Sequence, residues 1–414
     1  MKDYDYYNTL LVQNIGAKVH AIAPTLVSSA AFGYENAEEA EGIFKGEITN
    51  PLYARMGNPT TAKLESVVTK MEGGFGAIAT SSGMGALSMV MTAYLNTGDE
   101  VLCIGGFFGG TYTLVNETMH RFGVKGSFCD IDAFDTIEKK LQEGIHMVLI
   151  ETVGNPSLEL PDLPRVIALC HRYETLLVVD NTVTPLTLRP LEMGADIVVH
   201  STTKAMSGHS ASLGGIAVFR AIKEQDKLHH KKYQPLHPFI EKMGEKAMIA
   251  IAKKRAMRDM GMSANAYASF LTMLGLETLA LRIQRVQHSV VVLAKILNEK
   301  LPKNIGVSHP SLEENRFHER FINDFGQACG PIMTVECGNK ARAFKLLNKL
   351  KLVTQTANIG DNRTLALHME STIYRDFDKA TQKSLGVTDG LIRVSVGLED
   401  PIVIAKDFLQ AASE

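Results

Sequence analysis

The chain has 414 residues, of which 45% are hydrophobic and 21% are charged. These shares are ordinary for globular proteins, and the length predicts two or more domains with a large core. A formal net charge of −2 argues against nucleic acid or an anionic membrane as the main partner. No apolar run approaches the roughly 20 residues that span a bilayer, and the start, MKDYDYYNTL, lacks a signal-like apolar segment. We therefore expect a cytoplasmic protein.

Two further features of the composition, the cysteines and a basic cluster, do not indicate a functional site. The five cysteines show neither CxxC nor zinc-type spacing, which predicts reduced, buried thiols and no metal site. The basic cluster HHKK at 229–232 is typical of a solvated loop.

The first sixty residues are turn-rich and predict an irregular arm that ends in NPLYARMGNPTTAKLE. Asn58-Pro59 interrupts the chain there, and Thr60 or Thr61 can cap a helix that follows from Lys63. An arm of this kind lies more often on another domain or another subunit than on itself.

Apolar runs alternate with helical patterns from about residue 75 to 220. The runs predict five strands: GDEVLCIGG, GVKGSFCDID, HMVLIET, TLLVVDN and ADIVVHS. Between them stand the helical patterns SSGMGALSMVMTAYL, FGGTYTLVNETMHRF and PDLPRVIALCHRYE. Strands this apolar, with helices between them, predict a mostly parallel sheet that is covered on both faces.

The last third of the chain predicts a second, smaller region. Residues 221–260 are charge-rich and favour no single element, and NAYASFLTMLGLETLALRIQRVQHSVVVLAKILNEKL then predicts a helix that bridges to PIMTVEC, LALHME and LIRVSVGLED. We therefore divide the chain into an arm (1–62), a large domain (63–265) and a small C-terminal domain (266–414).

Polar residues follow three successive strands of the predicted sheet. HMVLIET runs into Asn155, TLLVVDN contains Asp180, and ADIVVHS leads to Ser201, Thr203 and Lys204. Ligands of open parallel sheets bind beyond the carboxyl ends of the strands. Each residue alone is as easily a cap or a turn residue, but the three positions together favour one site.

The segment SSGMGA (81–86) enters a predicted helix through small residues. Exposed backbone N–H groups and the helix dipole make such a start an anion site. The segment is neither a Walker loop nor GxGxxG, so it argues only weakly for a nucleotide, and helix packing explains its glycines equally well.

An anion site, a lysine and a carboxylate beside buried strands suit pyridoxal phosphate. Lys204 would bond to the aldehyde, and Asp180 would pair with the pyridinium nitrogen so that the ring is an electron sink. Asn155 can hydrogen-bond the phenolate oxygen, and Ser201 and Thr203 can bind the phosphate.

The motifs YARMGNPT, SSGMGA, FGGT, VGNP, VVDNT, HSTTK and RVSVGLED resemble, in order and over nearly the whole chain, the Cys/Met-metabolism family of pyridoxal-phosphate enzymes. The resemblance implies an α/β fold of the aspartate-aminotransferase-like class (fold type I). That fold has a large, mostly parallel sheet domain and a smaller C-terminal α/β domain. By resemblance, Lys204 bonds to the cofactor, while Asp180 and Asn155 contact the pyridinium nitrogen and the phenolate.

The resemblance also implies the other cofactor contacts. They are Arg55, Ser82, Gly83, Met84, Phe108, Thr182, Ser201 and Thr203, with Gly83, Met84, Ser201 and Thr203 in the phosphate cradle.

Four residues match family positions that serve the substrate or a neighbouring subunit. Tyr53 and Arg55 match a pair that reaches the partner's phosphate, which implies an obligate dimer, usually paired into a tetramer. We also count Tyr53 with Lys204 and Asp180 among the catalytic residues. Arg393 matches the arginine that binds the substrate carboxylate, and we assign Asn358 to the same task.

Three features select a reaction within the family. Gly110 stands where methionine γ-lyases typically carry cysteine, and Ala357 where cystathionine γ-lyases carry an acid. TANIGDN (356–362) and the long segment 221–265 resemble O-acetylhomoserine sulfhydrylases. We predict γ-replacement on O-acetylhomoserine, as in methionine biosynthesis. The alternatives are a methionine γ-lyase, a cystathionine γ-synthase-like enzyme and a non-catalytic cofactor-binding protein.

Two departures from the family pattern concern the pocket. Phe108 replaces a tyrosine that stacks on the cofactor and relays protons, and HMESTIY (368–374) replaces a His-Pro-Ala-Ser pattern. A stable anion such as acetate needs little help from an acid, so Phe108 favours an ester substrate, unless Tyr53 or water supplies the hydroxyl. Sulfide, a small thiol, cysteine and a sulfur-carrier protein all remain open as donors.

Overall fold

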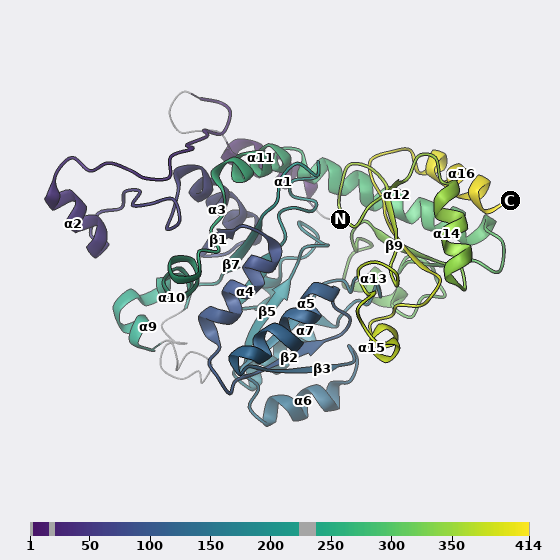
Figure 1. The fold of residues 1–414 in the computed structure, drawn as a ribbon, viewed down its shortest axis with the longest axis horizontal. Helices are drawn as coiled ribbons and strands as arrows, with labels where there is room; N and C mark the ends of the chain where they lie inside the picture. Colours follow the sequence, from purple (N-terminus) through teal and green to yellow (C-terminus); the bar gives the residue numbers. More distant parts are fainter. Residues whose placement is uncertain (1–2, 16–20, 223–236, 414) are drawn as a thin grey trace.

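The computed structural model describes residues 3–15, 21–222 and 237–413, so the cluster at 229–232 lies outside the described residues. It contains a seven-stranded sheet of order β1-β7-β6-β5-β4-β2-β3 and a five-stranded sheet of order β10-β11-β12-β9-β8 (Figure 1). A large α/β unit and a smaller C-terminal one are therefore present, as predicted. The boundaries at residues 62 and 265 stay a prediction.

The large sheet contains all five strands predicted for it. Its strands are β1 (Gly76–Thr80), β2 (Glu100–Ile104), β3 (Lys125–Cys129), β4 (Met147–Glu151), β5 (Leu176–Asp180), β6 (Ile197–His200) and β7 (Gly215–Phe219). Strands β2 to β6 run parallel, whereas β7 runs antiparallel to β1 and β6. The segment between β6 and β7 contains no helix. Antiparallel neighbours need no helical crossover connection, unlike parallel ones.

Helices cover both faces of the large sheet. On one face lie α3 (Pro59–Glu72), α6 (Phe134–Gln142) and α7 (Leu163–Arg172); on the other lie α4 (Gly83–Tyr94) and α10 (Ala247–Ala252). Alternate residues of every strand except the edge strand β3 enter the two cores, as Val179 and Val178 of β5 do. Burial on both faces explains the unbroken apolar runs of these strands.

Helix α3 begins at Pro59 and not at Lys63 as predicted. The side chain of Asn58 is the cap, because its Oδ1 accepts the Thr60 N–H at 2.9 Å. Proline suits the first helical position, where no N–H is needed. Neither Thr60 nor Thr61 is therefore the N-cap.

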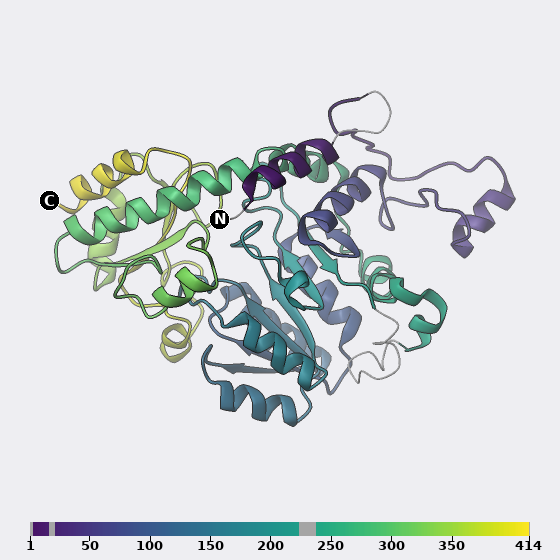
Figure 2. The same cartoon turned by 180° about the vertical axis from the view of Figure 1, so that it is seen from behind.

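The first sixty residues contain two helices that the turn-rich sequence concealed. Helix α1 (Tyr4–Ile15) buries Tyr7, Leu11 and Ile15, spaced four apart, in the core of the large unit. It lies beside the long helix α12, as the view from behind shows (Figure 2). The prediction of an irregular arm was wrong for this part.

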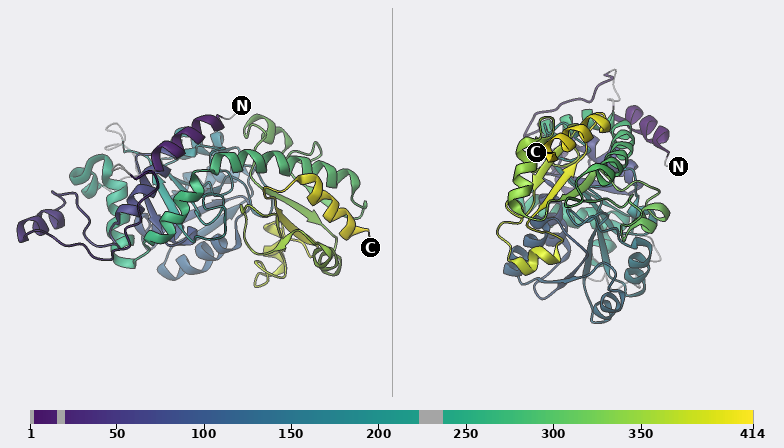
Figure 3. Two further views of the ribbon diagram at one scale, coloured as in Figure 1. Left: turned by 90° about the horizontal axis from the view of Figure 1, so that it is seen from above. Right: turned by 90° about the vertical axis from the view of Figure 1, so that its right-hand side faces the viewer.

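Residues 21–57 form the extended part of the N-terminal region. The segment carries α2 (Ala37–Lys45) and stands away from the rest of the molecule (Figure 3). Its side chains Ile22 and Phe44 are 94% and 71% exposed.

The helix predicted over 265–301 is two helices, α11 (Ala266–Leu276) and α12 (Leu279–Lys300), which meet at 62°. Apolar periodicity indicates which residues of a helix are buried, but it does not indicate whether the helix is straight. The bend lets both helices pack against the rest of the protein. Among the residues that the structure describes, no single helix is long and apolar enough to cross a membrane, although this bent pair is by length and composition.

The small sheet carries the three predicted C-terminal strands. Its members are β8 (Gly306–Ser308), β9 (Ile332–Glu336), β10 (Thr354–Gln355), β11 (Leu365–His368) and β12 (Leu391–Ser395). Helices α12, α14 (Lys340–Lys349) and α16 (Pro401–Ala412) pack against it. The remaining α-helices are short: α5 (Gly109–Thr113), α8 (Pro190–Met193), α9 (His237–Met243), α13 (His318–Asn323) and α15 (Lys379–Ser384). The five cysteines, all within the described residues, form no disulfide; four are buried, as predicted, and Cys129 is half-buried.

Candidate active site

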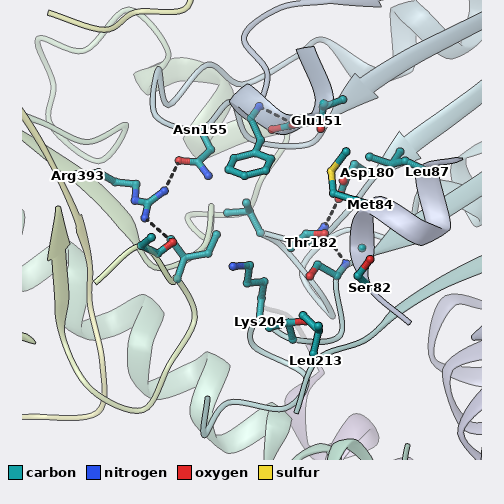
Figure 4. Close-up of a pocket in the computed structure, with 18 residues that line it drawn as sticks. Ser82, Met84, Leu87, Glu151, Asn155, Asp180, Thr182, Lys204, Leu213 and Arg393 are labelled. Atoms are coloured by element: carbon teal, nitrogen blue, oxygen red, sulfur yellow. Dashed lines mark hydrogen bonds between the residues drawn. The ribbon is translucent and has the colours of Figure 1, made fainter. Parts of the chain in front are cut away.

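A cavity of about 850 Å³, open solvent at its mouth included, lies beyond the carboxyl ends of β4, β5 and β6 (Figure 4). Its lining is Ser82, Gly83, Met84, Leu87, Phe108, Thr111, Glu151, Asn155, Asp180, Thr182, Val183, Ser201, Thr203, Lys204, Leu213, Ala357, Ile359 and Arg393. Every predicted site residue except Tyr53, Arg55 and Asn358 is in this set.

Lys204 directs its amine into the middle of the cavity (Figure 4). The turn after β6 positions it, since the Lys204 N–H donates to the Ser201 carbonyl at 3.2 Å. Its Nζ donates to Asn358 Oδ1 at 2.7 Å, so Asn358 belongs to the site although it does not line the cavity. Burial, together with the charge of Arg393, lowers the pKa of Lys204 to about 8. About a tenth of the amine is therefore neutral, and nucleophilic, at pH 7, a far larger fraction than an ordinary lysine offers.

Asp180 is the last residue of β5, and Thr182 holds its carboxylate. Its Oδ1 accepts the Thr182 N–H at 2.9 Å, and Thr182 Oγ1 accepts the Ser201 N–H at 2.8 Å. Burial raises the pKa of Asp180, whereas the hydrogen bonds from Thr182 and the charge of His200 lower it. A half-buried acid of fixed orientation results, beside the strand β6 that leads to Lys204.

The start of α4 forms one wall of the cavity. Ser82 caps it, because its Oγ accepts the Gly85 N–H at 3.0 Å. A Cβ on Gly83 would lie 2.6 Å from the Ser201 Cβ, and a Cβ on Gly215 would lie 2.1 Å from the Ser82 carbonyl oxygen. The glycines thus let the positive end of a helix approach the hydroxyls at the end of β6, which makes an anion site.

Arg393 comes from β12 of the small sheet, yet it contacts the large unit. Its Nη1 donates to Asn155 Oδ1 at 3.1 Å, and its Nη2 donates to the carbonyls of Asn358 at 3.2 Å and Ala357 at 3.4 Å. Burial lowers the pKa of Arg393 to about 10, so it remains a cation at neutral pH. The sequence alone favours no pairing between this arginine and Asn155.

Tyr53 and Arg55 lie outside the cavity of their own chain. They line a separate groove with Asn58 and Asn265, and Tyr53 is 46% exposed. The Arg55 guanidinium donates to the backbone carbonyl of Arg258 and lies 5.7 Å from the Tyr53 ring. Their role in a neighbouring subunit stays a prediction.

Glu151 is a cavity residue that sequence reasoning missed. It ends β4 as Asp180 ends β5, and the two are partners in the register of these strands. Burial, followed by the charge of Asp180, raises the pKa of Glu151 well above its usual range. The strand-end argument that selected Asp180 would have selected Glu151 too. The apolar lining residues Leu87, Val183 and Leu213 carry no such signal.

The donor set fits pyridoxal phosphate. It combines an amine of lowered pKa, a half-buried carboxylate, an amide and a helix start beside two hydroxyls. In that order, these are the groups that the aldehyde, the ring nitrogen, the phenolate and the phosphate require.

Comparisons with known proteins show the family of this chain. Residues 8–413 match the model of the family described as Cys/Met metabolism PLP-dependent enzyme. The homocysteine synthase of Schizosaccharomyces pombe is 33% identical, with 98% of each chain covered. The O-acetyl-L-homoserine sulfhydrylase of Leptospira meyeri is 32% identical, with 94% of this chain and 92% of that one covered.

A solved structure is similar over the same length. It is a putative O-acetylhomoserine (thiol)-lyase from Campylobacter jejuni that carries a pyridoxyl-lysine-5'-monophosphate. It matches at a TM-score of 0.93 and 26% identity, with 99% of this chain and 100% of that one covered. Fold, site and relatives together make this chain a member of the Cys/Met-metabolism family of pyridoxal-phosphate-dependent enzymes.

Proposed function

We propose that this enzyme replaces the γ-substituent of O-acetylhomoserine by a sulfur nucleophile and releases homocysteine and acetate, as methionine biosynthesis requires. The observation that carries the proposal is that Lys204, Asn358 and Arg393 meet at one cavity. The amine of Lys204 there lies near the buried guanidinium of Arg393, a cation suited to bind the carboxylate of an amino-acid substrate. The relatives named homocysteine synthase and O-acetyl-L-homoserine sulfhydrylase support the choice of reaction.

The packing around Gly110 supports an ester substrate over methionine. A Cβ at Gly110 would lie 2.7 Å from Cε1 of Phe108 and 3.4 Å from the sulfur of Met84. The cysteine expected of a methionine γ-lyase would therefore displace the Phe108 ring.

Arg393 binds the substrate carboxylate in this proposal. Its present acceptors, the Asn155 amide oxygen and two backbone carbonyls, are neutral. A carboxylate exchanges them for a charged acceptor that takes both prongs of the guanidinium, which is a stronger hydrogen bond. The substrate's α-carbon then stays at one place relative to Lys204.

Lys204 moves protons at the substrate carbons. Pyridoxal phosphate, when bound, supplies the electron sink that stabilises negative charge at the α-carbon. The lysine amine would take the α-proton, and once it has passed that proton on it would remove a β-proton. Asp180 would supply the negative charge that pairs with the ring nitrogen. Asn358 keeps the amine near the carboxylate site.

Phe108 offers an apolar face without a hydroxyl. The γ-leaving group receives no proton from this side chain, and acetate leaves as a stable anion without one. The sulfur arrives as sulfide or from a small carrier protein. Tyr53 and Arg55 serve the phosphate site of a second copy of the chain, and a homodimer, or a pair of dimers, follows.

The test is a panel with purified, cofactor-loaded enzyme. O-acetyl- and O-succinyl-homoserine are each supplied with sulfide or cysteine, and L-methionine is supplied alone, with Lys204→Ala as the inactive control. We expect homocysteine from the acetyl ester and sulfide. Turnover of methionine without any ester would make the enzyme a γ-lyase, and cystathionine as the main product would make it a γ-synthase.

A further inference from the structure

Tyr374 belongs to HMESTIY, the stretch that departs from the family pattern, and it is fully buried. Its hydroxyl lies 2.8 Å from the carbonyl oxygen of Asn155 and 3.2 Å from that of Phe107, so one proton is shared between two acceptors. Its ring packs under Gly109, where a Cβ would lie 3.3 Å away. A side chain from the small C-terminal part of the chain thus contacts two cavity loops of the large unit.

Glu151 contacts the same loop from the opposite side. Its Oε1 accepts the Phe108 N–H at 2.9 Å (Figure 4). The Phe107 carbonyl and the Phe108 N–H belong to one peptide group, so buried side chains from two distant elements occupy both of its hydrogen-bonding ends. Water cannot readily replace either partner, because Tyr374 is 0% and Glu151 8% exposed.

We propose that Tyr374 is a positioning residue. With Glu151 it fixes the peptide before Phe108, and with Arg393 it holds Asn155, whose carbonyl and side-chain oxygen are then both hydrogen-bonded. The consequence is a fixed relation between the Phe108 ring and the Asn155 amide, the two groups expected to face the cofactor ring. The inference rests on the cofactor contacts proposed above for those two residues.

The hydroxyl remains a donor over the working pH range. Burial raises the pKa of Tyr374, and the charge of Glu151 raises it further, against a smaller opposing effect of Arg393. The hydroxyl therefore stays protonated at neutral pH and can donate to these carbonyls.

Tyr374→Phe tests the proposal, because it removes the hydroxyl and keeps the ring. In the holoenzyme we expect the visible cofactor band to remain, with its pH midpoint raised by about half a unit, and the cofactor to dissociate about tenfold more readily. If the hydrogen bond from Asn155 to the phenolate is weaker, the phenolate oxygen is more basic and holds a proton shared with it more strongly. The pH midpoint of the band is therefore expected to rise. Tyr112→Phe, in the same aromatic cluster, is the matched control and should leave both quantities unchanged.

A purely structural role would give a different pattern. If Tyr374→Phe lowered the melting temperature but left the band midpoint and the cofactor affinity at the wild-type values, the proposal would be overturned. Should that variant not fold, Glu151→Gln and Glu151→Leu replace it. Glutamine keeps an acceptor for the Phe108 N–H and should bind cofactor normally, whereas leucine should bind it more weakly, and equal binding overturns the proposal. These measurements do not depend on which sulfur transfer the enzyme catalyses.

Discussion

Lys204 owes its properties to groups that lie far from it in the sequence. Asn358, 154 residues away, accepts its hydrogen bond, and Arg393 adds a positive charge to a largely buried site. Both burial and the like charge disfavour the ammonium form. The HSTTK motif therefore predicts which lysine is the nucleophile, whereas residues from the C-terminal part of the chain set its pKa.

The lowered pKa of Lys204 predicts how fast the apoprotein takes up pyridoxal phosphate. The neutral amine reacts, so the rate should rise with pH through a midpoint of about 8. Arg393→Gln removes the like charge and should move the midpoint upward. Stopped-flow absorbance measures the rate, Lys204→Ala serves as the blank, and a midpoint near the ordinary lysine value would contradict the prediction.

Arg393 offers a separate test of carboxylate binding. Arg393→Lys keeps the charge but loses the planar fork, so the KM for the homoserine ester should rise about tenfold while kcat changes less. Steady-state assays with varied ester decide it. An unchanged KM would remove the arginine from its proposed role.

At the level of secondary structure, the ends of the strands position the site residues, and glycines allow the start of α4 to approach them. The five predicted strands were recognisable from their apolar runs, which in β2, β4, β5 and β6 reflect burial on both faces. Their order along the chain placed Asp180 and Lys204 at one edge. Three features were not predictable in this way. The cap of α3 depends on one Asn58 side chain, α1 on contacts with α3 and α12, and the α11–α12 bend on packing against the body.

The close approach of β7 to the start of α4 predicts a cost for any side chain at Gly215. In Gly215→Ala the new Cβ would lie 2.1 Å from the Ser82 carbonyl oxygen and 2.7 Å from the Gly83 nitrogen, both backbone atoms. The helix start must therefore shift. We expect a melting temperature several degrees lower and weaker affinity for the cofactor phosphate. Gly306→Ala, whose new Cβ would meet only the Glu336 Cβ, at an ordinary 3.6 Å, is the control and should match the wild type.

At the scale of the whole molecule, the N-terminal segment 21–57 lies away from the cavity of its own chain. Residues 21–57 stand away from the body, and Tyr53 is half exposed in a groove of its own (Figure 3). Symmetric oligomers commonly complete one another's sites, which is the arrangement that the family resemblance implies for Tyr53 and Arg55.

Complementation tests the sharing of sites. Chains with Tyr53→Phe and Arg55→Ala, inactive by themselves, are mixed with inactive Lys204→Ala chains under conditions that exchange subunits. Partial activity should return, because mixed dimers contain one intact site. No recovery after mass spectrometry has shown mixed dimers would mean that each chain forms its own site.

The sequence by itself determined the cofactor, the order of the strands that carry it and the lysine. These depend on local chemistry: apolar runs specify buried strands, and polar residues directly after them share one edge of a sheet. Only the tertiary structure decided how Arg393 meets Asn155 across 238 residues and how Tyr374 meets it across 219. No periodicity records such contacts, since they arise when the small sheet packs against the large one and buries polar groups that must then find partners.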